Sequence, residues 1–324
     1  MAKYLIACMS IFLFFSCEEG EPGKKTVSAS SGNINHLNVV TSNDNWEGSI
    51  GDAIRDILAA PYEGLPQDEP MFSINQLPPE VFSGFAAKNR LVLKIEVGKN
   101  PQTVVEYNLF AKPQTVVIVG GKNEAEILEQ LQTNVGTIVD AFKKQELVEK
   151  QGRIGISLKE TANIEQQLGI SLNFPSVYRY AKNEDNFFWI RKTLTTGTLD
   201  IMLYQVPLES IRQGDSAVVD IISIRNAFGQ KYIEGEKPTA YMTTETAFSP
   251  YVFKGTIDNK PAIITKGIWR MENDFMGGPF VNYAIEDKAN NRYLMAEGYV
   301  YAPSVQKRDY VHEIEAILES VKFK

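Results

Sequence analysis

Hydrophobic residues recur along most of the chain at the spacings of helices and strands. Residues 49–60 place Ile50, Ile54, Ile57 and Leu58 on one face of a predicted helix, because side chains three and four positions apart share a helix face. The same spacing predicts further helices over residues 123–149, 160–168, 216–228 and 307–321. In the predicted helix 216–228, the residues expected to be buried are Val218, Val219, Ile222 and Phe228.

Runs rich in β-branched and aromatic residues predict strands between these helices. Turn signals such as Gly98–Pro101 and Asp258–Lys260 separate several of the runs, which favours pairing between strands that are neighbours in sequence. Strands are expected over residues 91–97, 103–110, 115–119, 171–180, 186–193, 198–206, 239–244, 251–256, 262–270, 280–285 and 293–301, and the folded body begins with an apolar run at residues 37–40.

This order of elements predicts an α+β fold. Runs of strands with short connections, flanked by helices, are typical of antiparallel sheets that helices cover. We expect two similar-sized halves of mostly antiparallel sheet covered by helices, an N-terminal half over residues 37–150 and a C-terminal half over residues 151–324. The C-terminal half loosely resembles a PsbP/Mog1-like α/β/α sandwich, a likeness of fold that carries no function.

The first residues have a different pattern. Lys3 precedes an apolar stretch from Tyr4 to Phe15, which has the length of a signal-peptide core and is too short to span a bilayer. The small residue Ser16 and then Cys17 follow, which resembles the lipobox of bacterial lipoproteins, although Phe14 stands where Leu is usual. We expect residues 1–16 to be a lipoprotein signal peptide and Cys17 to carry a lipid such as palmitate. The alternative is a conventional signal peptide with an incidental cysteine.

Residues 17–36 are small and polar, and we expect them to form a flexible, lipidated tether that holds the folded body beside a membrane. Glu18, Glu19 and Glu21 follow the cysteine closely, as in surface-exported lipoproteins of Bacteroidota. The expected location is therefore the cell envelope, with a lipid anchor in the outer membrane, on either its periplasmic or its surface face.

Composition narrows the possible partners. Without residues 1–16, the chain keeps 32 basic and 40 acidic side chains, a balance that gives no reason to expect nucleic acid as a partner. Cys17 is then the only cysteine, so neither an internal disulfide nor a cysteine-based zinc site is expected. The chain has two histidines, His36 and His312, and we expect no metal site and no cofactor.

Motifs for catalysis are weak. Val119–Asn123 offers a glycine turn between a strand and a helix, but it lacks the first glycine and the Ser or Thr of a phosphate-binding loop. Paired carboxylates occur at Asp68 with Glu69, at Glu272 with Asp274 and at Glu286 with Asp287, and such pairs are the usual groups for acid–base chemistry. With 40 acidic residues in the chain, adjacent pairs are also expected by chance.

Two segments have the composition of recognition sites. Tyr62–Pro70 is a proline-bounded loop with acidic residues, and Gly267–Phe280 combines Trp, Arg and Met with a Gly-Gly-Pro turn. The candidate binding residues that they supply are Asp68, Glu69, Trp269, Arg270 and Asp274. The alternative for the second segment is structural: Trp269, Phe275 and Phe280 would pack in the core, and Arg270 would pair with Asp274.

The same segments resemble an uncharacterised family of Bacteroidota lipoproteins, a domain of unknown function. The matching stretches are Trp46–Asp52, Leu65–Pro70, Asp274–Phe280, Tyr301–Pro303 and Lys307–Tyr310. This resemblance implies an envelope lipoprotein and brings no known activity and no catalytic residues.

The sequence therefore favours a membrane-anchored protein that binds a small ligand or an envelope protein without catalysis. One alternative is a hydrolase of envelope polymers that uses carboxylates such as Asp68, Glu69 or Asp274, which would then face each other across a cleft. A structural subunit of an envelope complex is the other alternative, and it would show a large exposed apolar patch.

Overall fold

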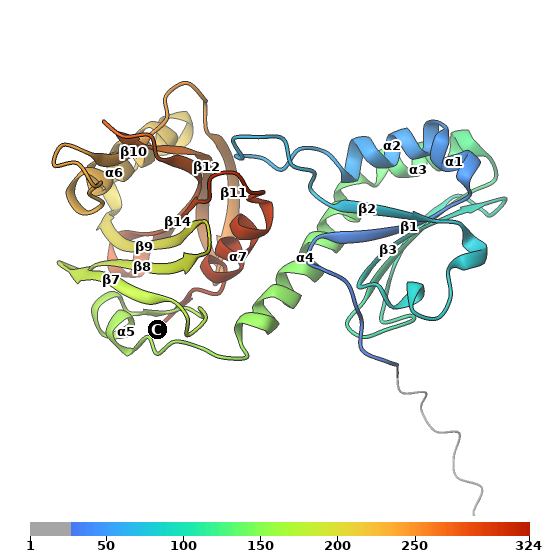
Figure 1. The fold of residues 1–324 in the computed structure, drawn as a ribbon, viewed down its shortest axis with the longest axis horizontal. Helices are drawn as coiled ribbons and strands as arrows, with labels where there is room; N and C mark the ends of the chain where they lie inside the picture. The colour runs from blue at the N-terminus through green and yellow to red at the C-terminus, as the bar shows by residue number, and fades with distance from the viewer. Residues whose placement is uncertain (1–26) are drawn as a thin grey trace, which may run out of the picture.

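Two lobes lie side by side in the computed structural model, which describes residues 27–324 (Figure 1). The N-terminal lobe comprises residues 27–154, and the C-terminal lobe comprises residues 155–324. The expected signal peptide (1–16), Cys17 and the first part of the expected tether lie outside the described residues. No helix among residues 27–324 is both long and apolar enough to cross a membrane.

The N-terminal lobe is a five-stranded sheet with helices. Its strands lie in the order β2-β1-β3-β5-β4. Its helices pack on the sheet, with α3 and α4 against β5 and with α2 against α3. The elements are β1 (His36–Val40), α1 (Asn43–Glu47), α2 (Ser49–Leu58), β2 (Ser73–Leu77), β3 (Leu91–Val97), β4 (Gln102–Tyr107), β5 (Thr115–Gly121), α3 (Glu124–Thr133) and α4 (Val135–Ile154).

The α+β class is confirmed, but the pairing in this lobe corrects the expected antiparallel sheet. The pairs β1–β2, β1–β3 and β3–β5 are parallel, and only β4–β5 is antiparallel. The turn at Gly98–Pro101 joins β3 to β4, yet β5 inserts between these two strands. A turn signal specifies a change of chain direction, whereas the choice of partner strand is made by contacts far apart in sequence.

The predicted helix 123–149 is two helices, because the chain bends at Asn134. The side chain of Asn134 donates a hydrogen bond to the carbonyl of Gln130 at 2.9 Å, and its backbone N–H bonds to the same carbonyl, which ends α3. The second helix, α4, continues to Ile154, past the expected end, and runs towards the C-terminal lobe (Figure 1).

The described part of the expected tether packs on the N-terminal lobe, which corrects its predicted flexibility. The backbone N–H of Ser31 bonds to Lys88 O at 2.9 Å, and the carbonyl of Ser31 accepts from Arg90 N at 2.9 Å. Ile34 is buried, and His36 already begins β1. Small polar residues have little to bury, but their backbone groups still form hydrogen bonds along the edge of a folded body.

The C-terminal lobe is an eight-stranded antiparallel sheet with a helix on each face. Its strands lie in the order β10-β12-β13-β14-β9-β8-β7, and β11 also pairs with β12. Helix α6 packs on one face and α7 on the other (Figure 1). The elements are α5 (Ala162–Leu168), β6 (Ile170–Ser171), β7 (Arg179–Glu184), β8 (Phe187–Leu194), β9 (Gly197–Pro207), α6 (Ala217–Tyr232), β10 (Tyr241–Thr244), β11 (Tyr251–Ile257), β12 (Lys260–Glu272), β13 (Gly277–Asp287), β14 (Arg292–Tyr301), α7 (Arg308–Leu318) and β15 (Lys322–Phe323).

Two sequence-based expectations fail in this lobe. The predicted strand 171–180 is mostly a connecting segment that contains Pro175, a residue without the N–H that a strand ladder needs. The buried face of helix α6 is also partly different from the expected one, because Val219 is 61% exposed and Arg225 is fully buried, whereas Ile222 and Phe228 pack against the core as predicted. Arg225 faces the sheet because it pairs with Glu297 of β14, a partner that the apolar pattern alone does not show.

One hydrophobic core joins the lobes. It includes Leu93 and Val119 of the N-terminal sheet, Phe142 of α4, and Ile314 and Ile317 of α7. A separate core lies between α6 and the opposite face of the C-terminal sheet. The side of α7 that faces the N-terminal lobe is therefore interior to the molecule, and polar side chains there are buried.

Candidate functional site

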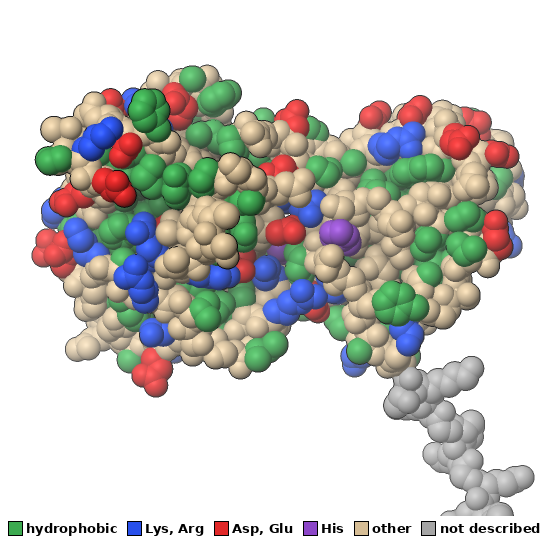
Figure 2. Space-filling view, viewed as in Figure 1, with side chains coloured by type: hydrophobic (Ala, Val, Ile, Leu, Met, Phe, Trp, Pro, Cys, Tyr) green, Lys and Arg blue, Asp and Glu red, His purple; other side chains and the backbone are tan. Residues whose placement is uncertain are grey.

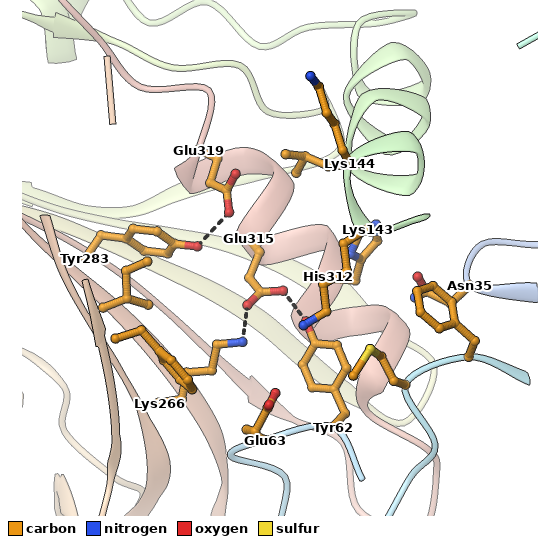
Figure 3. A pocket seen from close by; sticks show the side chains of 15 residues that line it. Asn35, Tyr62, Glu63, Lys143, Lys144, Lys266, Tyr283, His312, Glu315 and Glu319 are labelled. Carbon is orange, nitrogen blue, oxygen red and sulfur yellow. Dashed lines mark hydrogen bonds and ion pairs between the residues drawn. The ribbon is translucent and has the colours of Figure 1, made fainter. Parts of the chain in front are cut away.

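A cleft of about 310 Å³ lies where the two lobes meet. We call it the interlobe cleft. Acidic and basic side chains gather at the waist between the lobes (Figure 2), and Figure 3 shows those that line the cleft. The lining residues are Asn35, Tyr62, Glu63, Met71, Phe72, Lys143, Lys144, Leu147, Phe253, Ile264, Lys266, Tyr283, His312, Glu315 and Glu319.

Glu315 of α7 is the most heavily bonded group in the cleft. The ammonium of Lys266, on β12, lies 2.7 Å from Glu315 Oε1, and the hydroxyl of Tyr62 donates a hydrogen bond to Oε2 (Figure 3). Burial alone would raise the pKa of this carboxyl, but the charge and hydrogen bond of Lys266 outweigh burial and lower it. Glu315 is therefore held as a carboxylate that links α7 to both lobes.

Glu319 lies one helical turn after Glu315 and has a different environment. Tyr283 of β13 donates a hydrogen bond to Glu319 Oε1 at 2.9 Å, and no residue among 27–324 forms an ion pair with this carboxylate. Burial, followed by the negative charge of Glu315, raises the pKa of Glu319. The deprotonated form of Glu319 thus lacks a cationic partner.

His312 lies one turn before Glu315, among the same buried groups. Burial lowers the pKa of His312, against the opposing charge of Glu315, so the neutral imidazole is favoured. Its Nε2 atom is buried and has no hydrogen-bond partner among the described residues. The helix α7 thus presents an imidazole and two carboxyl groups with opposite pKa shifts to the cleft.

The opposite wall of the cleft, formed by α4, is positively charged. Lys143 and Lys144 of α4 are exposed at its border and form no ion pair with any of residues 27–324. By contrast, Lys150 of the same helix pairs with Glu313 at 3.2 Å. In Figure 3, Lys143 and Lys144 lie on the α4 side and Glu319 on the α7 side.

Apolar side chains lie between these two walls. They come from the loop before β2, from α4 and from the neighbouring strands β11 and β12, and they are Met71, Phe72, Leu147, Phe253 and Ile264. The cleft therefore combines an anionic wall, a cationic wall and an apolar surface between them. Chemically, this arrangement suits a ligand whose two opposite charges are separated by a hydrocarbon part.

The loop residues predicted from sequence do not enter this cleft. Asp68 is exposed. Glu69 is buried, and its carboxylate accepts the backbone N–H groups of Lys307 at 2.7 Å and Arg308 at 2.9 Å. These donors begin α7, so Glu69 stabilises the start of the helix that carries Glu315 and Glu319.

The other predicted residues lie at a separate, shallow depression. Trp269 is buried there and donates a hydrogen bond from Nε1 to Val300 O at 3.0 Å. Arg270 pairs with Glu272 at 2.6 Å, and Asp274 lies 3.7 Å from Lys237, so the expected Arg270–Asp274 pair is not formed. Phe275, which the structural alternative placed in the core, is fully exposed.

Apart from the loop that contains Tyr62 and Glu63, sequence reasoning missed the residues that line the interlobe cleft. One signal was present, because Glu315 and Glu319 are four residues apart in the predicted helix 307–321, beside its apolar residues Ile314, Ile317 and Leu318. Acidic side chains at this spacing share a face, and on a buried helix they need partners. The partners Tyr62, Lys266 and Tyr283 come from distant segments, so the sequence does not pair them.

No group of three or more metal-ligating side chains occurs within residues 27–324. A larger depression, of about 560 Å³, lies beside the start of α6. Its charged residues, Asp215, Lys254 and Glu286, are fewer than those of the interlobe cleft. We therefore take the interlobe cleft as the candidate functional site.

The fold and the site define a two-lobed α+β protein with a charged cleft between its lobes. The chain belongs to the DUF4837 family, a domain of unknown function, whose family model matches residues 157–320. A second domain of unknown function, DUF8532, matches residues 30–155. The two matches meet at the end of α4, where one lobe gives way to the other.

Comparisons with other proteins add little to this family assignment. No curated protein matches the sequence. A crystal structure from Bacteroides thetaiotaomicron VPI-5482 is similar with a TM-score of 0.28 and 8% identity, over 49% of this chain and 46% of that chain. This chain thus spans less than half the length of the Bacteroides protein. The solution structure of cyanobacterial PsbP from Synechocystis is similar with a TM-score of 0.34 and 9% identity, over 52% of this chain and 93% of that chain.

Proposed function

We propose that this protein is a lipid-anchored envelope protein that binds a small zwitterionic ligand in the interlobe cleft, without catalysis. The observation that carries the proposal is the charge arrangement of the cleft. Lys143 and Lys144 lack acidic partners on one wall, and Glu319 lacks a basic partner on the other.

Each wall fits one end of such a ligand. A carboxylate or phosphate would accept charge-assisted hydrogen bonds from Lys143 and Lys144. An ammonium would pair with Glu319, whose pKa is raised by burial and by the negative charge of Glu315. The apolar residues between the walls, such as Leu147 and Phe253, would contact the hydrocarbon part of the ligand.

A set of matched compounds tests this function. Leucine, phenylalanine and leucyl-leucine carry both charges, whereas leucinamide lacks the carboxylate and 4-methylpentanoate lacks the ammonium. We expect calorimetric titration to detect at least one of the zwitterions, and to find the two analogues bound about tenfold or more weakly. Binding of the zwitterions should also weaken as the pH falls through the raised pKa of Glu319, because the protonated carboxyl no longer attracts an ammonium.

Variants locate the binding. The double variant Lys143→Ala/Lys144→Ala and the single variant Glu319→Gln should each reduce the affinity, and Lys288→Ala is the control, since Lys288 is exposed and does not line the cleft. Absence of binding by all three zwitterions would contradict the proposal, and so would equal affinity for leucine and its two analogues.

The anchor is a separate part of the proposal. Its support is the sequence around Cys17, a small residue before a cysteine at the end of a short apolar stretch. Cells that express the protein should incorporate radioactive palmitate into it, and Cys17→Ala should abolish the labelling. Equal labelling of the two proteins would overturn the anchor and leave the ligand site untouched.

A hydrolase is the second candidate, and one observation favours it. Glu319 has a raised pKa and Glu315 a lowered one, and two carboxyl groups with opposite shifts are typical of an acid and its companion carboxylate. However, both carboxyl groups lie on the same side of the cleft, four residues apart, and do not face each other across it. Glu315 also already pairs with Lys266 and accepts a hydrogen bond from Tyr62. If purified protein releases reducing ends from isolated cell-wall polymers and Glu319→Gln abolishes this release, the protein is an enzyme.

A further inference from the structure

A second hollow, of about 280 Å³, lies in the C-terminal lobe on the face of the sheet that α6 covers. We call it the aromatic pocket. Alternate residues of strands β8, β12 and β14 line it, because side chains two positions apart point to the same face of a sheet. Its main lining residues are Trp189, Arg191, Trp269, Met276, Tyr299 and Tyr301.

Packing between aromatic side chains of β12 and β14 gives the pocket its shape, and glycine residues at the start of β13 lie beside it. Trp269 packs edge-on against Tyr299, with ring centroids 5.2 Å apart, and against Tyr301 at 6.3 Å. A Cβ atom on Gly278 would lie 2.0 Å from Val300 O and 3.2 Å from Trp269 Nε1. Glycine at this position therefore lets β13 approach β14 beside the buried indole.

Hydrogen bonds to Asp200 hold the side chains of Trp189 and Arg191 of β8 in place. Asp200 of β9 is fully buried, and its Oδ1 accepts hydrogen bonds from Trp189 Nε1 and Arg191 Nε, each at 2.7 Å. The guanidinium of Arg191 also lies 4.4 Å from the centre of the Trp189 ring. A polar group and an aromatic side chain are thus fixed side by side, which is the usual composition of a preformed ligand site.

Polar groups in and around the pocket have unused hydrogen-bonding capacity. The hydroxyl of Tyr299 is buried, and its polar neighbour is the guanidinium of Arg191. Arg191 bonds to Asp200 through Nε, and those N–H groups of its terminal amino groups that do not face Tyr299 are available as donors. Thr198 adds a hydroxyl at the border of the pocket.

The charges around the pocket argue against a charged ligand. Asp200 compensates Arg191 at 2.7 Å. At the border, the exposed carboxylates of Glu234 and Glu236 would repel an anion. A cation would lie close to the guanidinium of Arg191, which already covers one of the two faces of the Trp189 ring. An uncharged ligand is repelled neither by these carboxylates nor by the guanidinium.

We propose that the aromatic pocket binds an uncharged sugar ring, such as a neutral pyranose unit of a glycan. The C–H faces of a pyranose pack on aromatic side chains, and its hydroxyl groups both donate and accept hydrogen bonds. The partly exposed rings of Trp189 and Tyr301 supply the aromatic surfaces above the buried Trp269, and Arg191, Thr198 and Glu234 supply donors and acceptors. This site is separate from the interlobe cleft, so the proposal does not depend on the function proposed above.

Intrinsic fluorescence tests the proposal directly, because Trp189 and Trp269 both line the pocket and the third tryptophan, Trp46, lies in the other lobe. In a Trp46→Phe background, the purified protein is titrated with methyl glycosides of glucose, galactose, mannose and N-acetylglucosamine. Galacturonate and N-acetylneuraminate serve as anionic probes. We expect a saturable change in tryptophan emission with at least one neutral glycoside and weaker binding of both acids.

Two pocket variants and one cleft variant make the test specific. Tyr301→Ala and Trp189→Phe should each raise the dissociation constant, Tyr301→Ala by about tenfold, and circular dichroism checks that both variants fold. Lys143→Ala/Lys144→Ala should leave sugar binding unchanged, since these lysines line the interlobe cleft. The proposal is overturned if no neutral glycoside gives a saturable response at millimolar concentration, if the acidic sugars bind more tightly, or if neither pocket variant changes the affinity.

Discussion

Arg225 and Glu297 form an ion pair inside the C-terminal lobe, and both side chains are fully buried. Arg225 Nε lies 2.7 Å from Glu297 Oε1, and Arg225 also donates to Thr244 Oγ1 at 2.8 Å. Removing one partner leaves a buried charge uncompensated, so Arg225→Ala should lower the free energy of unfolding by about 3–5 kcal/mol. Chemical denaturation followed by circular dichroism measures this loss.

Two controls separate burial from charge. Arg212 pairs with Asp220 at 2.7 Å near the start of the same helix but is exposed, so Arg212→Ala should cost much less than Arg225→Ala. The double variant Arg225→Met/Glu297→Leu should recover most of the lost stability, because no unpaired charge is left. Equal losses for Arg212→Ala and Arg225→Ala would show that the buried pair does not stabilise the fold.

His312 predicts a dependence of stability on pH. Burial lowers its pKa in the folded protein, whereas the unfolded chain titrates near pH 6.5. As the pH falls below about 6.5 the unfolded state binds the proton first, so stability decreases. Between pH 7.5 and 5.5 the wild type should therefore lose more stability in denaturant titrations than His312→Gln, which cannot take up this proton.

The second histidine provides the matched control. His36→Gln alters a half-buried side chain of β1 outside the interlobe cleft and should keep the pH dependence of the wild type. If His312→Gln shows the same loss of stability as the wild type, another group is responsible for the pH dependence.

At the scale of elements, the start of α7 depends on a residue from the other lobe. Glu69 accepts the backbone N–H groups of Lys307 and Arg308, which have no partner within the helix. Glu69→Ala leaves these donors unsatisfied and should lower the free energy of unfolding by about 1–2 kcal/mol. The neighbouring Asp68 is exposed, and Asp68→Ala should change stability by less than about 0.5 kcal/mol.

This pair of variants also distinguishes two roles for the acidic loop. Thermal and chemical denaturation of the two proteins measures the structural role. If Asp68→Ala destabilises the protein as much as Glu69→Ala, the loop acts through its overall charge and not through the bonds to α7.

At the scale of the whole molecule, the core that joins the lobes predicts cooperative unfolding. Leu93 of the N-terminal sheet and Ile314 of α7 belong to one buried cluster. Leu93→Ala should therefore destabilise both lobes together, by about 2–5 kcal/mol. In a Trp46→Phe background, emission from Trp189 and Trp269 in the C-terminal lobe should report the reduced midpoint, and calorimetry should show a single transition.

Independent unfolding of the two lobes would give a different result. If Leu93→Ala leaves the unfolding midpoint of Trp189 and Trp269 unchanged while circular dichroism shows an earlier transition, the lobes unfold independently. The interlobe cleft would then lie between two units that are stable without each other.

Local patterns predicted much of the fold. Strands β3, β5, β9 and β14 and the helices α2 and α7 lie close to their predicted ranges, because apolar spacing reports which side of an element is buried. The order of strands was not predictable in this way. Insertion of β5 between β3 and β4 and the burial of Arg225 on α6 both depend on partners that are distant in the sequence.

The candidate site was less predictable than the fold. The sequence picked out the loop Tyr62–Pro70 and the segment Gly267–Phe280, and the structure uses both in other ways than expected. Tyr62 reaches the cleft while Glu69 caps α7, and Trp269 lines the aromatic pocket while Phe275 is exposed. Unusual composition indicates where a chain is constrained, but it does not distinguish a ligand contact from a structural one.

By itself, the sequence determined the α+β class, most of the helices and strands, and the expectation of a lipid anchor at Cys17, because each of these depends on residues close together in the chain. Only the tertiary structure decided which strands pair, that the described part of the tether packs on the body, and that Tyr62, Lys266 and Glu315 meet in one cleft. These features arise from contacts between residues up to 253 positions apart. Their energies depend on burial and on the partner at hand, and neither is encoded in local spacing.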